Sequence, residues 1–392
     1  MRKLVVVILA FVAIVAAMAI YVIVTTPRRG AGVRFPLNDA QRALLAQVPQ
    51  SAESFALIPT AAALEAKLRA NPITADAVAQ WEEKHSIPAR WMMGGADLLL
   101  WRDADGGTHY MVHADPIRSL FVRNEQSGAP MDAAERDAIL ALANGLPPGD
   151  ALVVQRAESR GAFPPIARPA VTSVSVSDNA IELTSRAQTT TANSQQPTAN
   201  VFPRGALLTA FFSSTPPRLI DDLNRLFGTK VSPLLENGGT IAVYDVDARK
   251  LLPRPMGVIA VPADDARRAA LGELVDRAKV AEAIGVRVRT AEKDGQLLLS
   301  FDDSIDTYLK DAFEPARWPA NRWALRMDAH RAAPIARQLR ESIGLRVASP
   351  RLFRSARDLD RWIGGLERAS TIDAADSDDG AYEVLEVRVA AK

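Results

Sequence analysis

The chain has 392 residues, with no cysteine and with 47 basic residues against 46 acidic ones. Without cysteine there can be no disulfide, no thiolate metal site and no cysteine nucleophile. The near-zero net charge provides no basic field of the kind that attracts nucleic acid, so we expect no nucleic-acid partner. With 48% hydrophobic and 24% charged residues, the composition is that of a globular protein of about two or three domains.

The first predicted element is a transmembrane helix over Leu4–Val24, an apolar run without a charged residue. An α-helix rises about 1.5 Å per residue, so about twenty residues cross the roughly 30 Å hydrocarbon core of a bilayer. The alternative is a cleaved secretory signal, for which residues 17–19 (AMA) offer a cleavage site. We favour a retained anchor, because the apolar run continues from Ile20 to Val24, where a signal peptide would turn polar.

The basic residues beside this segment leave its orientation nearly undecided. Arg2 and Lys3 precede the segment, and Arg28, Arg29 and Arg34 follow it, whereas the positive-inside rule depends on an excess at one end. The short N-terminal flank and the large region behind it favour a cytoplasmic N-terminus, and the opposite orientation stays open. Abundant alanine and arginine indicate a bacterial genome. We therefore expect a single-pass protein of the bacterial inner membrane with a periplasmic C-terminal domain.

Behind the anchor, strands and helices alternate along the sequence. The first group is predicted as a helix at 39–48, a strand at 54–59, a helix at 60–70 with Thr60 as its N-cap, a helix at 76–85 and a hairpin at 96–113 turning at 103–107. A helix at 131–143 and strands at 151–155, 172–176 and 180–185 are expected to follow.

The succession of strand, helix and hairpin returns twice. The second copy is a strand at 206–213, a helix at 215–228 and a hairpin at 240–261; the third is a strand at 323–327, a helix at 330–344, a turn at 373–380 and a strand at 382–389. A further hairpin at 286–301, turning at 293–295, precedes a helix at 304–313. These repeated β-α-β-β units predict the α+β class, with antiparallel sheets that carry helices on one face.

A polar segment rich in Thr, Asn, Gln and Ser, at 187–203, separates two α+β domains. It is predicted to be a flexible linker or surface loop, or else an arm that becomes ordered on a partner. The expected organisation is an anchor at 1–25, a spacer at 26–35, domains at 36–186 and 204–392 around this linker, and a weaker sub-boundary near 315–322.

No motif in the sequence indicates catalysis. The chain has no G-x-S-x-G elbow, no phosphate-binding P-loop and no G-x-G-x-x-G fingerprint. His109 and His113 lie in a predicted strand, where their Cα atoms would be about 13 Å apart, too far to share one metal ion. The acidic run at 373–380 (DAADSDDG) resembles a calcium loop, but Ala375 stands where its first carboxylate is needed. We expect no catalytic residue, no metal and no cofactor.

The six tryptophans fall into two groups, at 81–101 and at 318–362. Clustered aromatic residues belong either to cores or to recognition surfaces, and the core is the default interpretation. Trp91 and Trp318 lie in loop-like stretches beside Pro88 and Pro319. These two tryptophans are therefore our candidates for contact with a partner.

The anchor, the stretch SFALIPTAAALEAKLRANPITADAVAQWEEKH and the stretch LLLWRDADGGTHYMV resemble uncharacterised bacterial envelope proteins with one N-terminal helix and a repeated α+β extracytoplasmic region. The resemblance covers residues 1–115 and implies the topology, but no functional residue.

We expect a non-enzymatic binding protein, scaffold or accessory subunit of the envelope, held in the membrane by Leu4–Val24 and contacting an envelope protein. One alternative is an envelope hydrolase built from dispersed carboxylates and His113, which needs a cleft with at least two convergent titratable groups. The other is a carrier of lipids or apolar ligands, which needs a continuous apolar cavity.

Overall fold

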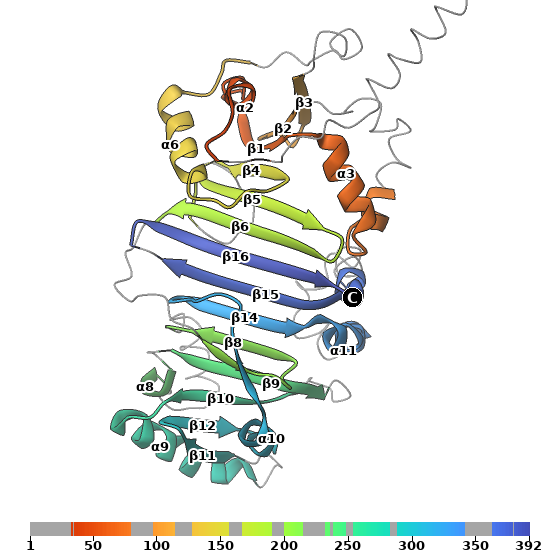
Figure 1. The fold of residues 1–392 in the computed structure, drawn as a ribbon. Coiled ribbons are helices and arrows are strands. Elements are labelled where there is room, and N and C mark those ends of the chain that lie inside the picture. Colours follow the sequence, from red (N-terminus) through yellow and green to blue (C-terminus); the bar gives the residue numbers. More distant parts are fainter. Residues whose placement is uncertain are drawn as a thin grey trace, which may run out of the picture. The chain divides into compact units, whose positions relative to one another are not determined.

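The computed structural model describes residues 33, 35–79, 97–113, 128–156, 167–189, 200–214, 232–235, 238–247, 254–282, 288–341, 363–378 and 380–392 (Figure 1). The chain divides into two compact units. The first comprises Met1–Thr190 with Tyr382–Val384, and the second comprises Thr191–Ala381 with Leu385–Lys392. Both units combine helices with antiparallel strands, which confirms the predicted α+β class.

The first unit contains a sheet with the strand order β3-β2-β1-β4-β5-β6. Its strands are β1 (Ala52–Ile58), β2 (Asp97–Asp103), β3 (Thr108–His113), β4 (Ala151–Gln155), β5 (Ala170–Ser177) and β6 (Ala180–Gln188). Neighbours pair antiparallel throughout this order. The β2–β3 hairpin turns where it is predicted to turn, and Gly106 takes the positive φ of 88° that this turn requires.

Helices contact both faces of this sheet. The helices are α2 (Asp39–Leu45), α3 (Ala61–Ala70) and α6 (Ala133–Ala143). Leu57 of β1 packs with residues of α2 and α6, including Ile139, in one large apolar cluster. Ile58 packs instead with Ala61, the first residue of α3. Successive strand residues point to opposite sides, so α3 begins on the other face, and the predicted restriction of helices to one face does not hold here.

The second unit contains a sheet with the strand order β11-β12-β10-β9-β8-β14-β15-β16 and a ribbon of β7 and β13. The strands are β7 (Val201–Pro203), β8 (Leu208–Phe212), β9 (Gly239–Asp247), β10 (Arg254–Pro262), β11 (Arg289–Lys293), β12 (Gln296–Ser300), β13 (Phe313–Pro315), β14 (Trp323–Asp328), β15 (Ala369–Asp378) and β16 (Tyr382–Ala391). The helices are α8 (Ser232–Leu235), α9 (Asp265–Glu282), α10 (Ser304–Lys310) and α11 (Ala329–Glu341).

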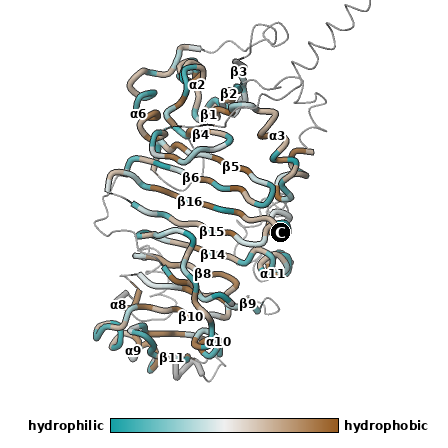
Figure 2. The backbone as a smooth tube through the Cα atoms, viewed as in Figure 1, coloured by the Kyte–Doolittle hydropathy of each residue, from teal (hydrophilic) through white to brown (hydrophobic). Residues whose placement is uncertain are grey.

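Helices also cover both faces of the second sheet. Leu271 and Leu274 of α9 pack with α8 and with Val261 on one side, while Tyr308 of α10 packs with Ala260 on the other. Figure 2 shows hydrophobic and hydrophilic residues mixed along α9, as expected for a helix with one buried side.

Two local predictions are wrong. Thr60 precedes α3, but it adopts a left-handed conformation (φ 58°, ψ 58°) and its side chain makes no capping hydrogen bond. The acidic run at 373–380 is not a turn over most of its length, because β15 continues to Asp378 and the positive φ of 88° falls at Gly380. The other predicted elements are present wherever the structure describes them. The predicted helix at 215–228 and residues 80–85 lie outside the described part.

The two units meet in sequence between Thr190 and Thr191, inside the predicted linker. That linker is shorter than predicted, because residues 187–188 end β6 and Phe202, which is 1% exposed, anchors β7. The predicted sub-boundary at 315–322 lies within the second unit. The predicted anchor, Leu4–Val24, lies outside the described residues, among which no helix is both long and apolar enough to cross a bilayer.

Candidate ligand-binding pocket in the second unit

A pocket of about 340 Å³ lies where β8 ends and β9 begins. Its lining residues come from β8, β9, β10, β12 and the residue after β8: Phe211, Phe212, Ser213, Gly239, Thr240, Ala260, Pro262 and Gln296. Thr240 lies opposite both Phe211 and Ala260 in the sheet, and Pro262 lies opposite Gln296. Residues directly opposite each other project to the same side, so the pocket rests on neighbouring strands that hold its lining in register.

Two glycines allow the strands to approach closely beside the pocket. Gly238 has φ +78°, and a Cβ placed on it would lie 2.2 Å from the carbonyl oxygen of Phe212. A Cβ on Gly239 would lie 2.8 Å from the carbonyl oxygen of Ala260 and 3.5 Å from the Phe212 ring. Any other residue at either position would push the strands apart.

The lining combines the aromatic ring of Phe211 with uncharged hydrogen-bonding groups. Ser213 and Thr240 contribute hydroxyls, and Gln296 contributes a carboxamide. The Gln296 Oε1 accepts a hydrogen bond from the Tyr308 hydroxyl at 3.4 Å, which leaves the amide nitrogen to donate to a ligand. Burial raises the pKa of Tyr308 to about 12, so this hydroxyl stays protonated at neutral pH. None of the eight lining residues carries an acid or a base for proton transfer.

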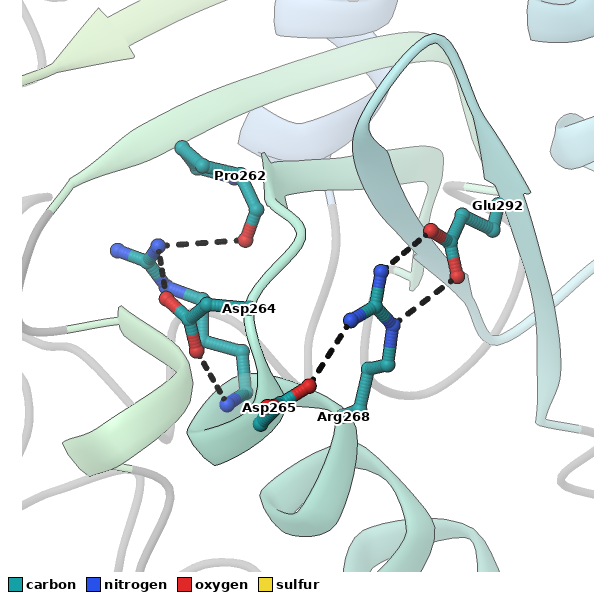
Figure 3. Close-up of polar contacts among 6 residues, drawn as sticks. Pro262, Asp264, Asp265, Arg268 and Glu292 are labelled. Atoms are coloured by element: carbon teal, nitrogen blue, oxygen red, sulfur yellow. Dashed lines mark hydrogen bonds and ion pairs between the residues drawn. The ribbon is translucent and has the colours of Figure 1, made fainter.

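A buried arginine adjoins the pocket at Pro262. The Nη1 of Arg267, in the first turn of α9, donates to the Pro262 carbonyl oxygen at 3.2 Å and to Asp264 Oδ2 at 2.8 Å (Figure 3). Asp264 also caps α9, because its Oδ1 accepts the backbone N–H of Arg267 at 2.7 Å. Arg267 is 4% exposed, so its charge is held inside the protein.

The next residue, Arg268, points to the surface. It donates to Glu292 of β11 at 2.7 and 3.3 Å and to Asp265 at 3.2 Å (Figure 3). The hydrogen bond with Glu292 raises the pKa of Arg268 and lowers the pKa of Glu292. Because both side chains are about half exposed, solvent screens their attraction. Two adjacent arginines thus have different environments.

Two aspartates of β15 pair with arginines that lie in β14 or directly before it. Asp373 lies opposite Arg326 in the sheet and accepts from its Nε at 2.7 Å. Arg326 also contacts Glu314 of β13, which ties the β7–β13 ribbon to the sheet. Asp376, 2% exposed, lies 3.6 Å from Arg322. These two acidic residues of β15 therefore have a structural role, and among the described residues no cluster of three or more His, Asp or Glu could hold a metal ion.

Of the two predicted partner-contact residues, only Trp318 is described by the structure, and it does not line the pocket. Trp91 lies outside the described residues. Trp318 is half-buried against the cluster of Phe202 and Ala320, and the Arg317 guanidinium lies 5.1 Å from its ring centroid. Phe211 packs on this same cluster, so Trp318 is linked to the pocket wall by apolar packing.

The two predicted strand histidines are not brought together as a site. His109 stacks on Trp101 at 5.4 Å, and its Nε2 lies 3.1 Å from Asp103. His113 pairs through its backbone position with Asp97 at the start of β2. The pocket was not predicted from the sequence, because its residues show only the pattern of ordinary strands. Its one signal is the Gly238-Gly239 pair beside the aromatic end of β8.

Comparisons of the chain with protein-family models, with curated proteins and with solved structures give no match.

Proposed function

We propose that this chain is a membrane-anchored binding protein of the bacterial envelope, with Leu4–Val24 in the inner membrane and the α+β region in the periplasm. Its ligand occupies the pocket of the second unit and has a small, planar body. The observation that carries this proposal is the lining, which offers the aromatic ring of Phe211 and three neutral hydrogen-bonding side chains. Such walls can orient a ligand, but they supply no general acid or base.

The same lining weighs against the two alternative functions. A hydrolase needs a nucleophile with a base close by, and although Ser213 and Thr240 carry hydroxyls, none of the lining residues is a base. A lipid carrier needs a continuous apolar cavity. The pocket volume of about 340 Å³ lies at the lower end of the roughly 300–1,000 Å³ of small-molecule sites, and the hydroxyls of Ser213 and Thr240 interrupt its apolar surface.

A scaffold or accessory role would use the neighbouring ribbon. Val201 of β7 and Phe313 of β13 are large apolar residues that are 55% and 39% exposed. Phe313 also packs edge-on against Tyr308, with ring centroids 5.1 Å apart, and Tyr308 holds the pocket residue Gln296. This packing supports coupling between a protein partner on the ribbon and a ligand in the pocket. Trp91 and Trp318 stay predictions for the same contact.

We also infer that the α+β region consists of repeated β-α-β-β units. The order strand, helix, strand, strand occurs in β1-α3-β2-β3, in β8-α8-β9-β10 and in β14-α11-β15-β16. In the second unit, the leading strands β8 and β14 pair antiparallel. In the first unit, β1 pairs in the same way with β4, which leads β5 and β6.

The anchor is tested by adding protease to intact spheroplasts that carry the full chain with a tag after Lys392. Digestion of the tag supports a periplasmic domain. Protection that is lost on lysis would place the domain in the cytoplasm and contradict the proposed location.

The pocket is tested by calorimetric titration of the full-length protein in nanodiscs with benzamide, a small planar amide. We expect Thr240→Trp to abolish binding by filling the pocket, and Thr290→Trp to leave it unchanged, because Thr290 is an exposed threonine of β11. Equal binding by both variants, or no binding by the wild type, would contradict the assignment of this pocket as the ligand site.

A further inference from the structure

Three polar groups in the pocket lining are not used by the protein itself. The hydroxyls of Ser213 and Thr240 and the amide nitrogen of Gln296 make no hydrogen bond within the described part of the chain, and all three atoms are open to solvent. Hydroxyls inside the first unit behave differently, since Thr172 and Ser185 bond to each other at 2.8 Å. Open, unpaired polar groups that line one concavity are available to a ligand.

The lining is also uncharged, because none of its eight residues is acidic or basic. An ion that entered this pocket would give up its hydration and find no opposite charge in the lining, which is costly. A neutral polar ligand would exchange hydrogen bonds with water for hydrogen bonds with the three open groups. The ligand is therefore expected to be uncharged.

Tyr308 decides which end of the Gln296 amide faces the pocket. Its hydroxyl donates to Gln296 Oε1 at 3.4 Å, the one side-chain hydrogen bond that Tyr308 makes in the described part of the chain. If the amide were reversed, the phenol proton would lose this acceptor, on a residue that is only 4% exposed. Burial raises the pKa of Tyr308 to about 12, so the proton is present at neutral pH. The amide oxygen therefore turns to Tyr308, and Nε2 is left for the pocket.

This orientation restricts the hydrogen bonds that a ligand can make. A carboxamide nitrogen only donates, whereas the hydroxyls of Ser213 and Thr240 donate or accept. The ligand must therefore present an acceptor to Gln296, and its second polar group can be of either kind. Phe211 lies opposite Thr240 in the sheet and projects to the same side, where its ring can pack against a planar ligand.

We propose that the ligand is an uncharged aromatic amide or lactam whose carbonyl oxygen accepts a hydrogen bond from Gln296 Nε2. Tyr308 is the positioning residue that turns this nitrogen toward the pocket. The proposal names the ligand class of the proposed binding site, and it rests on that proposed function.

The test is calorimetric titration of the full-length protein in nanodiscs with three probes of similar shape: benzamide, thiobenzamide and benzamidine. Thiobenzamide is neutral, but its sulfur is a weak acceptor, and benzamidine is a cation that only donates. We expect benzamide to bind about two- to tenfold more tightly than thiobenzamide, the range that one neutral hydrogen bond gives. Benzamidine should bind more weakly than both.

Two variants of Gln296 test the direction of the hydrogen bond. Gln296→Met keeps a similar length without the amide, so benzamide should lose its advantage over thiobenzamide. Gln296→Glu places an acceptor where the donor was, so benzamidine should then bind more tightly than benzamide. Gln296 is a half-buried residue at the start of β12, and circular dichroism checks that both variants are folded.

Two tyrosine variants test the positioning role. Tyr308 and Tyr244 belong to the same apolar cluster, but the Tyr244 hydroxyl donates to Asp311 at 3.2 Å and not to a pocket residue. Tyr308→Phe lets the amide turn either end to the pocket, so the ratio of benzamide to thiobenzamide affinity should fall. A purely structural role would weaken both probes equally and leave the ratio unchanged. Tyr244→Phe is the matched control and should not alter the ratio.

The failures are distinguishable. If the wild type binds neither benzamide nor thiobenzamide, the proposed binding function fails. If it binds the two equally, or if the benzamide advantage persists in Gln296→Met, pocket binding stands and the recognition of a carbonyl by Gln296 is overturned. If the advantage is lost in Gln296→Met but unchanged in Tyr308→Phe, the ligand class is supported and the positioning role of Tyr308 is overturned.

Discussion

The two units follow the same strand order, and they differ in what is added to it. The first has β3-β2-β1-β4-β5-β6, and the second has β10-β9-β8-β14-β15-β16. In both units, the first three of these strands along the chain form a meander. The next strand, β4 or β14, pairs with the free edge of the first, β1 or β8. The second unit continues beyond β10 with α9 and the hairpin β11–β12. Gln296 starts β12 and Arg267 lies in α9, so the candidate site depends on the addition.

The units also differ in how their interiors are held. The first has one large apolar cluster that joins α2, α6 and five strands, and a small one beside α3. In the second, the described apolar residues form several smaller clusters, and ion pairs such as Arg326 with Asp373 lie between strands. The comparison teaches that a shared strand order does not require a shared kind of core.

The largest expected effect is on the continuous core of the first unit. Leu152 and Leu298 are both 0% exposed, but Leu152 belongs to the large cluster and Leu298 to a small one that includes Ala242 and Ala260. We expect either Leu→Ala change to lower the free energy of unfolding by about 2–5 kcal/mol, with Leu152→Ala nearer the upper end because more neighbours lose contact. Urea unfolding of the two variants measures this. A larger loss for Leu298→Ala would contradict the distinction between the cores.

The second effect concerns the ion pairs of the second unit. Arg326→Met leaves Asp373, whose side chain is 11% exposed, without its cross-strand cation. We expect a loss of about 2 kcal/mol, less than the roughly 3–5 kcal/mol for a fully buried pair, because Arg326 is partly exposed. The double change Arg326→Met with Asp373→Leu should recover most of the loss, since no buried charge is left. If the double variant is no more stable than the single one, the pair is not what holds these strands.

A smaller, pH-dependent effect is expected at α10. Burial raises the pKa of Tyr308 from 10.0 to about 12, so the unfolded chain releases this proton at lower pH than the folded one. The contribution to stability is full below pH 10 and is lost as the pH rises from 10 through 12. Tyr308→Phe should therefore lose less stability than the wild type across this interval. Parallel curves of unfolding free energy against pH for the two proteins would show that Tyr308 is not the cause.

Most of the fold could be predicted from periodicity, because strands such as β1 and helices such as α6 bury regularly spaced apolar residues. β15 could not, because three of its five buried residues are Asp373, Asp376 and Asp378, and acidic runs normally indicate exposed turns. Asp373 pairs with Arg326 of β14, and Asp376 with Arg322 just before it, about fifty residues earlier in the chain. A local sequence pattern does not contain such a pairing.

The candidate site was harder to predict for a related reason. Phe211 and Thr240 are ordinary strand residues, and they become pocket walls only through the register of β8 with β9. Arg267 and Arg268 are indistinguishable in sequence, although one is buried and the other exposed. Side-chain burial of this kind is decided by tertiary packing.

The smallest expected effect tests what attaches the added hairpin to α9. Arg268 bridges α9 and Glu292 of β11, but α9 and the hairpin also share the apolar cluster of Leu274 in α9 and Leu299 in β12. Exposed ion pairs contribute little and are screened by salt, so Arg268→Gln should leave the urea midpoint unchanged at both low and high salt. A clear loss at low salt that disappears at high salt would mean that charge, rather than the apolar cluster, holds the hairpin. The second unit would then use ion pairs at its edge as well as between its central strands.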